Sequence, residues 1–140
     1  RPLFEPILWF MKPYPQGGTL TDNILEYGVG AFNEGKLKEL SIWNEGLEVC
    51  SNILKVQTQK SDRGLHPTQK AVKLLEILIA MVTLEGQTVL DPFCGCGTTL
   101  VAARNLNREY IGFEINEAYY NSIMVRMGDA PASTSTHRPE

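Results

Sequence analysis

The chain has 140 residues, of which 43% are hydrophobic and 21% are charged, a composition that predicts a single soluble globular domain and excludes a disordered chain. The formal net charge of -3 excludes a strongly basic nucleic-acid binder, so any such role must rest on local charge. The three cysteines form no disulfide framework, which predicts a reducing cytoplasm. Since no apolar run could span a bilayer, we expect no membrane partner.

The first part of the chain has few regular patterns. Residues 5–12 are an apolar, β-rich run bounded by prolines, which predicts a strand, and residues 13–21 resemble a turn. Glycines interrupt residues 22–48, so we expect irregular structure with at most one short strand or helical turn. Residues 49–56 are a further candidate strand. The chain begins at Arg1, without an initiator methionine, and runs straight into strand-like sequence, so we expect a piece of a longer protein.

Basic residues outnumber acidic ones between residues 50 and 73. Lys55, Lys60 and Arg63 are therefore candidates for contact with nucleic-acid phosphates, although a solvated loop would have the same composition. Farther along, a helical period ends at Gly86, and Thr68 is a candidate N-cap. The period is carried by Leu75, Leu78, Ile79 and Val82.

Two lysines are expected near the start of that helix. Lys70 and Lys73 would lie in its first two turns, where the helix dipole disfavours cations. A docked carboxylate or phosphate would explain this placement. The alternative is that both side chains simply extend into water, and the position alone does not decide between the two.

A compact β-α-β unit is predicted between residues 88 and 115. A short apolar strand ends in Asp91, a turn with Gly95 and Gly97 follows, and residues 98–106 favour a helix. Residues 110–115 alternate as a second strand that carries the acid Glu114 near its end. Strand, glycine turn and helix place backbone N–H groups and a positive helix end beside a ligand. The spacing predicts a nucleotide-sized site.

Three nucleotide motifs compete for the glycine turn. A phosphate-binding loop is excluded because Thr98 stands where it requires a lysine. A dinucleotide fingerprint is disfavoured by Leu100 at its third glycine position, although Glu114 lies at a suitable distance to bind a ribose. A ligand that joins an amino-acid head to a nucleoside explains more, because Asp91 suits an ammonium group and Glu114 suits two ribose hydroxyls. S-adenosylmethionine has this structure.

The remaining patterns are structural. Asn116 is a candidate cap for a last apolar-faced helix that Gly128 would end, and residues 129–140 have the composition of a disordered tail. A zinc site is disfavoured because the cysteine spacing does not match a zinc knuckle and the other ligands are scattered. Its ligands would have been Cys50, His66, Cys94 and Cys96.

Three ordered motifs resemble the amino-directed DNA methyltransferases. The stretch Asp91-Pro-Phe-Cys-Gly-Cys-Gly-Thr-Thr99 is similar to their cofactor motif D-P-F-x-G-S-G-T-T. His66-Pro-Thr-Gln-Lys70 is similar to the H-P-T-Q-K segment that precedes it, and Tyr110-Ile-Gly-Phe-Glu-Ile115 to their ribose-binding strand. The resemblance covers residues 65–127. It implies an α/β, Rossmann-like S-adenosylmethionine-dependent methyltransferase fold, here with a partial sheet.

The resemblance also implies the roles of individual residues. Asp91 and Phe93 would border the methionine part of the cofactor, and Glu114 would bind the ribose, with Ile115 against the adenine. Thr68 and Lys70 would close over the cofactor carboxylate. Backbone and hydroxyl contacts would come from Gly95, Gly97 and Thr98. Cys96 replaces the usual serine, which puts cofactor affinity in question, and Ala71 replaces the usual proline.

The family's catalytic tetrapeptide, Asp/Asn/Ser-Pro-Pro-Tyr/Phe, is absent from this sequence. Lys12-Pro-Tyr-Pro15 is similar only superficially, since it lacks an acceptor side chain. We therefore expect the C-terminal, cofactor-binding part of an enzyme whose cofactor motif lies near its C-terminus, with no catalytic residue and no metal of its own. Residues 1–18 would be a strand and turn from the catalytic side, 19–60 the target-recognition region, and 61–128 the cofactor unit.

The resemblance implies methyl transfer to the exocyclic amine of adenine in double-stranded DNA, in a bacterial or phage-infected cell. The partners would be DNA and a missing N-terminal catalytic half, and a homodimer is compatible with this reading. We expect this chain alone to be inactive. The alternatives are a cytosine amino-methyltransferase, a non-enzymatic DNA-binding module, and a fragment of a nicotinamide-dependent oxidoreductase.

Overall fold

The computed structural model describes residues 5–28, 30, 35, 38 and 53–128. The predicted tail, most of the stretch 29–52 and Cys50 lie outside these residues. Within the described part, no helix is long and apolar enough to cross a membrane. The elements in chain order are α1 (Leu20–Tyr27), the 3-10 turn η1 (Lys60–Asp62), α3 (Val72–Val82), β1 (Thr88–Asp91), α4 (Thr98–Asn105), β2 (Glu109–Gly112) and α5 (Glu117–Met127).

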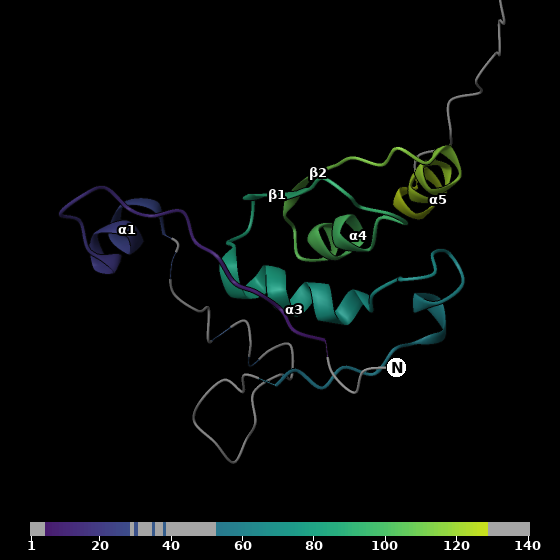
Figure 1. Cartoon of the computed structure of the whole chain (residues 1–140), viewed down its shortest axis with the longest axis horizontal. Coiled ribbons are helices and arrows are strands. Elements are labelled where there is room, and N and C mark those ends of the chain that lie inside the picture. The colour runs from purple at the N-terminus through teal and green to yellow at the C-terminus, as the bar shows by residue number, and fades with distance from the viewer. Residues whose placement is uncertain (1–4, 29, 31–34, 36–37, 39–52, 129–140) are drawn as a thin grey trace, which may run out of the picture.

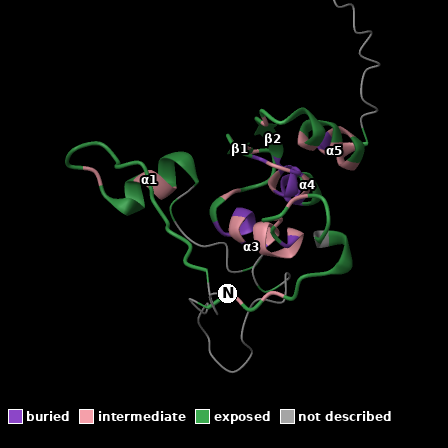
Figure 2. Ribbon diagram, turned by 45° about the vertical axis from the view of Figure 1, so that its right-hand side comes forward, coloured by how far each residue is buried: buried purple, intermediate pink, exposed green. Residues whose placement is uncertain are grey.

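The predicted β-α-β unit is confirmed. Strands β1 and β2 pair in parallel, with Thr88 opposite Glu109 and Asp91 opposite Gly112. Helix α4 lies between this two-stranded sheet and α3 (Figure 1). The core lies between the two helices, where Figure 2 shows buried residues on their facing sides. It is built from Ile79, Ala80, Ala102, Ala103 and Leu106, with Val89 of the sheet packed against them.

Small side chains bring these three layers close together. Ala102 and Ala103 are completely buried in α4. A Cβ added to Gly112 would lie 2.7 Å from Leu100 of α4, closer than real Cβ atoms approach other atoms. Strand β2 can therefore contact α4 at this level only because residue 112 is glycine.

The second strand is shorter than the sequence predicts. It ends at Gly112 rather than at residue 115. The Phe113 N–H still donates to Asp91 O at 3.0 Å, but the Phe113 carbonyl accepts from the N–H of Cys94 in the glycine turn. The chain therefore leaves the sheet to follow the glycine turn, and Glu114 lies beyond the strand end.

Helix α3 starts later than predicted. Its N-cap is Ala71, which makes no side-chain cap, so the prediction of Thr68 as N-cap is wrong. Thr68 instead bonds the ring of His66, with its N–H 3.2 Å from Nδ1. Lys70 consequently precedes the helix and does not lie in its first turn. The helix also ends at Val82, before Gly86.

A buried arginine fastens the carboxyl ends of α3 and α4. Arg108 is 4% exposed, and its guanidinium donates to Thr83 O at 2.8 Å, to the Thr83 hydroxyl at 3.1 Å and to Leu106 O. A cation is favoured beside the negative end of a helix dipole. The arginine therefore satisfies backbone carbonyls that the two helices leave unpaired.

The last helix, α5, has the predicted bounds. The Asn116 side chain accepts from the N–H groups of Ala118 and Tyr119, and Gly128 closes the helix with a φ of 79°. A left-handed glycine and an asparagine cap are the expected end signals of a helix. Ile123 of α5 is buried against Cys94 and Leu100.

The N-terminal part differs from its prediction. Residues 5–15 form no strand, because β1 and β2 pair with each other and not with this segment. Residues 53–56 form no strand either. Helix α1 was not predicted, although Thr19 and Asp22 form a capping box and Gly28 ends the helix with a φ of 67°.

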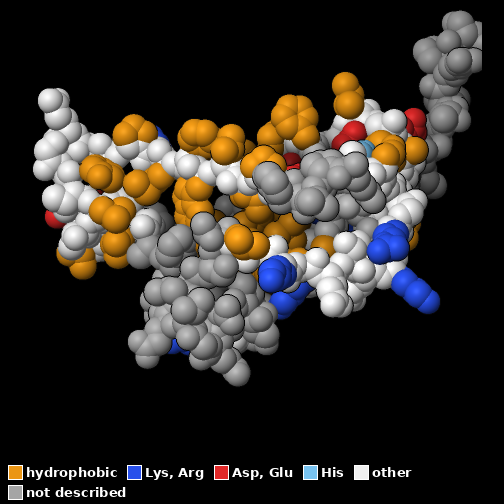
Figure 3. All heavy atoms as spheres, turned by 60° about the horizontal axis from the view of Figure 1, so that its bottom comes forward, with side chains coloured by type: hydrophobic (Ala, Val, Ile, Leu, Met, Phe, Trp, Pro, Cys, Tyr) orange, Lys and Arg blue, Asp and Glu red, His pale blue; other side chains and the backbone are white. Residues whose placement is uncertain are grey.

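The apolar side chains of this N-terminal part are largely exposed. Helix α1 buries no residue. Figure 3 shows hydrophobic side chains exposed on the face at the α1 end of the molecule. Five consecutive residues of the extended segment are exposed: Ile7, Leu8, Trp9, Phe10 and Met11.

Candidate cofactor-binding site

The glycine turn joins β1 to α4 at the carboxyl end of the parallel strands. The Gly97 N–H donates to Cys94 O at 2.7 Å, which closes the turn. The Cys94 N–H and Sγ both lie near Phe113 O, at 3.0 and 3.2 Å. The turn is thereby fixed to the segment that follows β2, at the edge of the sheet where α/β proteins bind ligands.

Glu114 is held from two sides at this edge. Its Oε2 accepts from the Gly95 N–H at 2.9 Å, and its Oε1 accepts from the Asn116 N–H at 2.8 Å. A carboxylate oxygen can accept more than one hydrogen bond, so each oxygen can still accept from a ligand hydroxyl. The backbone therefore fixes the orientation of a carboxylate that retains capacity for two hydroxyls.

Asp91 provides a second carboxylate. Its Oδ1 accepts from the Phe93 N–H at 3.0 Å, which orients the side chain at the end of β1. Burial raises the pKa of the Cys94 thiol, and the negative charges of Asp91 and Glu114 raise this pKa further. Both carboxylates therefore lie close enough to act on one thiol. Such a site favours a ligand that carries positive charge near its hydroxyls.

The start of α4 supplies partial positive charge, in contrast to the negative charges of Asp91 and Glu114. Gly97 is the N-cap, with a φ of 75° and no side-chain cap. A Cβ at residue 97 would also lie 3.0 Å from Ile123, so glycine is required by conformation and is favoured by the limited space. Because no side chain caps them, the first N–H groups of α4 can serve an anionic group of a ligand.

Cys96 and Thr98 lie on the inner side of the turn. Both are buried, and the Cys96 Sγ lies 3.6 Å from the Thr98 hydroxyl. The Arg126 Nη1 lies 3.6 Å from this sulfur and 3.3 Å from the same hydroxyl. The Thr98 hydroxyl is therefore bonded within the protein, whereas the resemblance implies a cofactor contact for it. The replacement of serine by Cys96 likewise changes an interior contact.

The residues before α3 cover the turn from the side. The closest ring atom of His66 lies 3.5 Å from the Cβ position of Gly95, and the ring centroids of His66 and Tyr119 are 4.4 Å apart. Since His66 Nδ1 accepts from the Thr68 N–H, we assign the ring proton to Nε2. The structure thus brings Thr68 to the site through His66. No role at the site was predicted for Tyr119.

Lys70 does bind a carboxylate, but the carboxylate belongs to the chain itself. Its Nζ forms an ion pair with Glu5, and the two side chains are 44% and 66% exposed. The expected anion near Lys70 is therefore present as Glu5. A ligand carboxylate could replace it, because an exposed ion pair is weak.

Two exposed hydrophobic residues flank the turn. Phe93 is 89% exposed after β1, and Ile115 is fully exposed after Glu114. Large apolar side chains in these positions can cover a flat, partly apolar ligand. The structure therefore gathers Asp91, Phe93, Gly95, Gly97, Glu114 and Ile115 around one edge of the sheet.

The basic residues expected to contact nucleic acid are exposed. Lys55 lies in the extended segment before η1, Lys60 begins η1, and Arg63 follows it. Over the residues that the structure describes, no group of three or more His, Cys, Asp or Glu side chains is placed to hold a metal. Cys94 and Cys96 are free thiols in the core around the turn.

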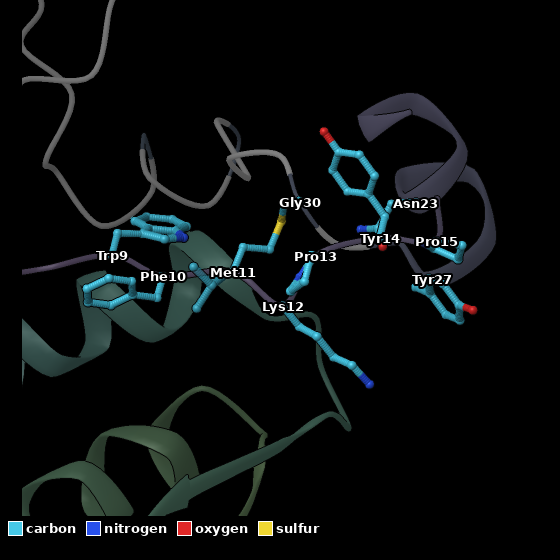
Figure 4. A pocket seen from close by; sticks show the side chains of 11 residues that line it. Trp9, Phe10, Met11, Lys12, Pro13, Tyr14, Pro15, Asn23, Tyr27 and Gly30 are labelled. Atoms are coloured by element: carbon cyan, nitrogen blue, oxygen red, sulfur yellow. The ribbon is translucent and has the colours of Figure 1, made fainter. Parts of the chain in front are cut away.

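A separate concavity of about 780 Å³ lies between residues 9–15 and α1. It contains the Lys12-Pro-Tyr-Pro15 stretch and is also lined by Tyr27 and Val82. In Figure 4 the side chains of Lys12 and Tyr14 extend away from each other. Polar groups that do not converge cannot orient a ligand, so we assign no site there.

Comparison with known proteins points to one family. A family described as "DNA methylase" (N6_N4_Mtase) matches residues 1–125. The chain is 52% identical over 128 residues to the type II methyltransferase M.HindIII of Haemophilus influenzae, covering 91% of this chain and 41% of that protein. It is 40% identical over 96 residues to M2.DpnII of Streptococcus pneumoniae, covering 69% of this chain and 35% of that protein. The chain thus spans about two fifths of these relatives.

Solved structures show the same similarity. The M1.HpyAVI–SAM complex superimposes with a TM-score of 0.55 at 30% identity, over 69% of this chain and 43% of that one. The cytosine-N4-specific PvuII DNA methyltransferase superimposes with a TM-score of 0.52 at 28% identity, over 59% of this chain and 33% of that one. These neighbours confirm the predicted methyltransferase fold. Together with the match over residues 1–125, they show that the chain belongs to the N6/N4 DNA methylase family.

Proposed function

We propose that this chain forms the S-adenosylmethionine-binding part of a DNA methyltransferase that modifies the exocyclic amine of adenine. The observation that carries the proposal is the Glu114 carboxylate, which the N–H groups of Gly95 and Asn116 hold at the carboxyl end of the sheet. A solved relative supports the cofactor, since M1.HpyAVI forms a complex with SAM.

The residues at the turn fit this cofactor group by group. The Glu114 oxygens can each accept from one ribose hydroxyl, and Asp91 can pair with the ammonium group of the amino-acid part. The uncapped N–H groups at the start of α4 can donate to its carboxylate. The exposed side chains of Phe93 and Ile115 can cover its apolar parts.

The bound cofactor would supply a methyl group already activated by a sulfonium, so this part of the enzyme has to bind and orient rather than form covalent bonds. Asp91 and Glu114 place negative charge beside that cation. The ring of His66, which accepts from the Thr68 N–H, packs beside Gly95 at the side of the turn. Such positioning is a principal source of rate enhancement in a group transfer.

The target amine and its acceptors would come from the remainder of the enzyme. The chain spans 41% of M.HindIII and contains no Asp/Asn/Ser-Pro-Pro-Tyr/Phe tetrapeptide. We assign residues 1–18 to the catalytic side and residues 19–60 to target recognition, as the motif order indicates. The base would have to leave the duplex to reach the cofactor.

Binding can be tested by calorimetric titration of S-adenosylmethionine and its demethylated product into the wild-type chain and Glu114→Gln. Loss of charge-assisted bonds should weaken binding by about 10- to 100-fold. Glu109→Gln is a matched control, because Glu109 is an exposed acid at the start of β2, the strand that Glu114 follows. Equal affinity of the wild type and Glu114→Gln would show that the ribose is not bound here.

The target base requires a completed enzyme. We would join this chain to the N-terminal part of M.HindIII, to which it is 52% identical, and digest the methylated DNA for mass spectrometry. The proposal predicts N6-methyladenine. If methylated cytosine were the sole product, the target base would be cytosine and not adenine. Cytosine is the target of the PvuII relative.

Contact with DNA is proposed for Lys55, Lys60 and Arg63, which are exposed on one short segment. Each phosphate contact contributes to the slope of log affinity against log salt concentration. Replacing all three by Gln in the completed enzyme should therefore reduce that slope by about 2 to 3. Unchanged salt dependence would indicate that the segment is merely solvated.

A further inference from the structure

A second arginine, Arg126, donates a hydrogen bond to the backbone of the glycine turn. Arg126 lies in the last turn of α5, and its Nη1 donates to the Cys96 carbonyl at 2.6 Å. The same nitrogen lies within hydrogen-bond distance of the Thr98 hydroxyl and the Cys96 sulfur. One guanidinium thus contacts the two residues on either side of Gly97.

The peptide group between Cys96 and Gly97 is fixed at both ends. Its carbonyl accepts from Arg126, and its N–H donates to Cys94 O at 2.7 Å. This peptide sets the left-handed conformation of Gly97, from which α4 begins. Its orientation consequently determines where the first N–H groups of α4 point.

Arg126 is itself held by another arginine. Arg104, in the last turn of α4, donates to Met127 O at 2.9 Å and to Arg126 O at 3.3 Å. These are carbonyls of the carboxyl end of α5, where a cation is favoured. Helix α4 therefore fixes the end of α5, and α5 in turn fixes the residues from which α4 starts.

We propose that Arg126, supported by Arg104, is a positioning residue that keeps the glycine turn in its cofactor-binding conformation. The inference rests on the proposed function of the turn. Arg126 acts through the Cys96 carbonyl and the Thr98 hydroxyl, which it holds away from the ligand side. A planar guanidinium can donate to several acceptors from a fixed position, whereas a lysine ammonium is a flexible point charge.

The test compares Arg126→Met, Arg126→Lys and Arg104→Met with the wild-type chain. Amide hydrogen exchange of Gly95 and Gly97 without cofactor reports on the turn, and calorimetry reports on S-adenosylmethionine binding. Val125→Ala is the matched control, because Val125 is the exposed neighbour of Arg126 on α5. Thermal unfolding separates a local effect from a loss of the fold.

We expect Arg126→Met to accelerate exchange at Gly97 and to weaken cofactor binding by about tenfold or more, while α3 keeps its protection. Arg126→Lys should recover part of both effects, and Arg104→Met should add little to Arg126→Met in the double variant. Turn exchange and affinity equal to wild type would overturn the inference. So would equal acceleration in the turn and α3, which would indicate general destabilisation.

The outcomes separate this inference from the proposed function. If the wild type binds no cofactor but Arg126→Met still accelerates exchange only at the turn, the positioning role stands and the cofactor assignment fails. If the wild type binds cofactor, and neither amide exchange at the turn nor cofactor affinity changes in Arg126→Met, the cofactor assignment stands and the positioning role fails.

Discussion

Residues 5–28 and residues 72–128 have similar compositions but bury their apolar side chains to different extents. Residues 72–128 bury one cluster of side chains between α3 and α4 and a second between the glycine turn, α4 and α5. Residues 5–28 contain a similar proportion of large apolar side chains, yet α1 buries none and the segment before it exposes five in succession. The difference lies in available partners, because apolar surface stabilises a fold only where another layer removes it from water.

The sharpest way to test this contrast is to truncate one leucine in each region. Leu100 is 5% exposed and Leu25 is 80% exposed. Leu100→Ala should lower the free energy of unfolding by about 2–5 kcal/mol, and Leu25→Ala should change it by less than about 0.5 kcal/mol. Urea unfolding followed by circular dichroism measures both. Equal losses would mean that α1 belongs to the same cooperative core.

Helix caps give a second matched pair. Asn116 accepts from two N–H groups of α5, and Thr19 caps α1. Asn116→Ala should reduce the free energy of unfolding by about 1 kcal/mol, because α5 packs on the core. Thr19→Ala should leave the global transition unchanged and accelerate exchange in α1 alone. A common loss in both variants would contradict the separation of the two regions.

Alkaline pH tests the electrostatics of the site. The folded state raises the pKa of Cys94 above the ordinary thiol value of 9.0, so folding favours the protonated thiol. This contribution is complete below that value and is lost as pH rises toward the folded pKa. We expect Cys94→Ala to lose less stability than the wild type between about pH 8 and about pH 10. Parallel pH profiles of the two unfolding midpoints would argue against it.

The smallest effect concerns the ion pair between Glu5 of the N-terminal region and Lys70, which precedes α3. If the Lys70 ammonium binds the cofactor carboxylate, Glu5 competes for the lysine, and Glu5→Gln should strengthen S-adenosylmethionine binding by about 1.5- to 5-fold. In a Lys70→Ala background the same change should have no effect. Weaker binding in Glu5→Gln, measured by calorimetry, would show that the pair supports the site instead of competing with the cofactor.

The sequence was most informative where a structure depends on neighbours along the chain. The strand ending at Asp91, the glycine turn, α4 and the caps of α5 are local signals, and the structure confirms them. The strand expected at residues 5–12 failed because a strand requires a partner that composition does not reveal. The sequence contains the capping box of α1, formed by Thr19 and Asp22, but the glycines that follow favoured irregular structure, so this helix was not predicted.

The site shows the same difference between features with a local sequence signal and features that depend on contacts between distant residues. The motif order indicated Asp91 and Glu114 as neighbours of one turn, and the structure places them there. Arg126 gave no signal, since a contact with the Cys96 carbonyl 30 residues earlier depends on how α5 packs. The Glu5 partner of Lys70 was equally hidden, because the two residues are 65 positions apart.

The short connections within the β-α-β unit have a consequence for folding. Strands β1 and β2 pair after a single intervening helix, and α3 precedes them directly in the chain. Contacts between residues close in sequence cost little loop entropy and form quickly. We therefore expect the β-α-β unit to form early in folding, before the N-terminal segment packs.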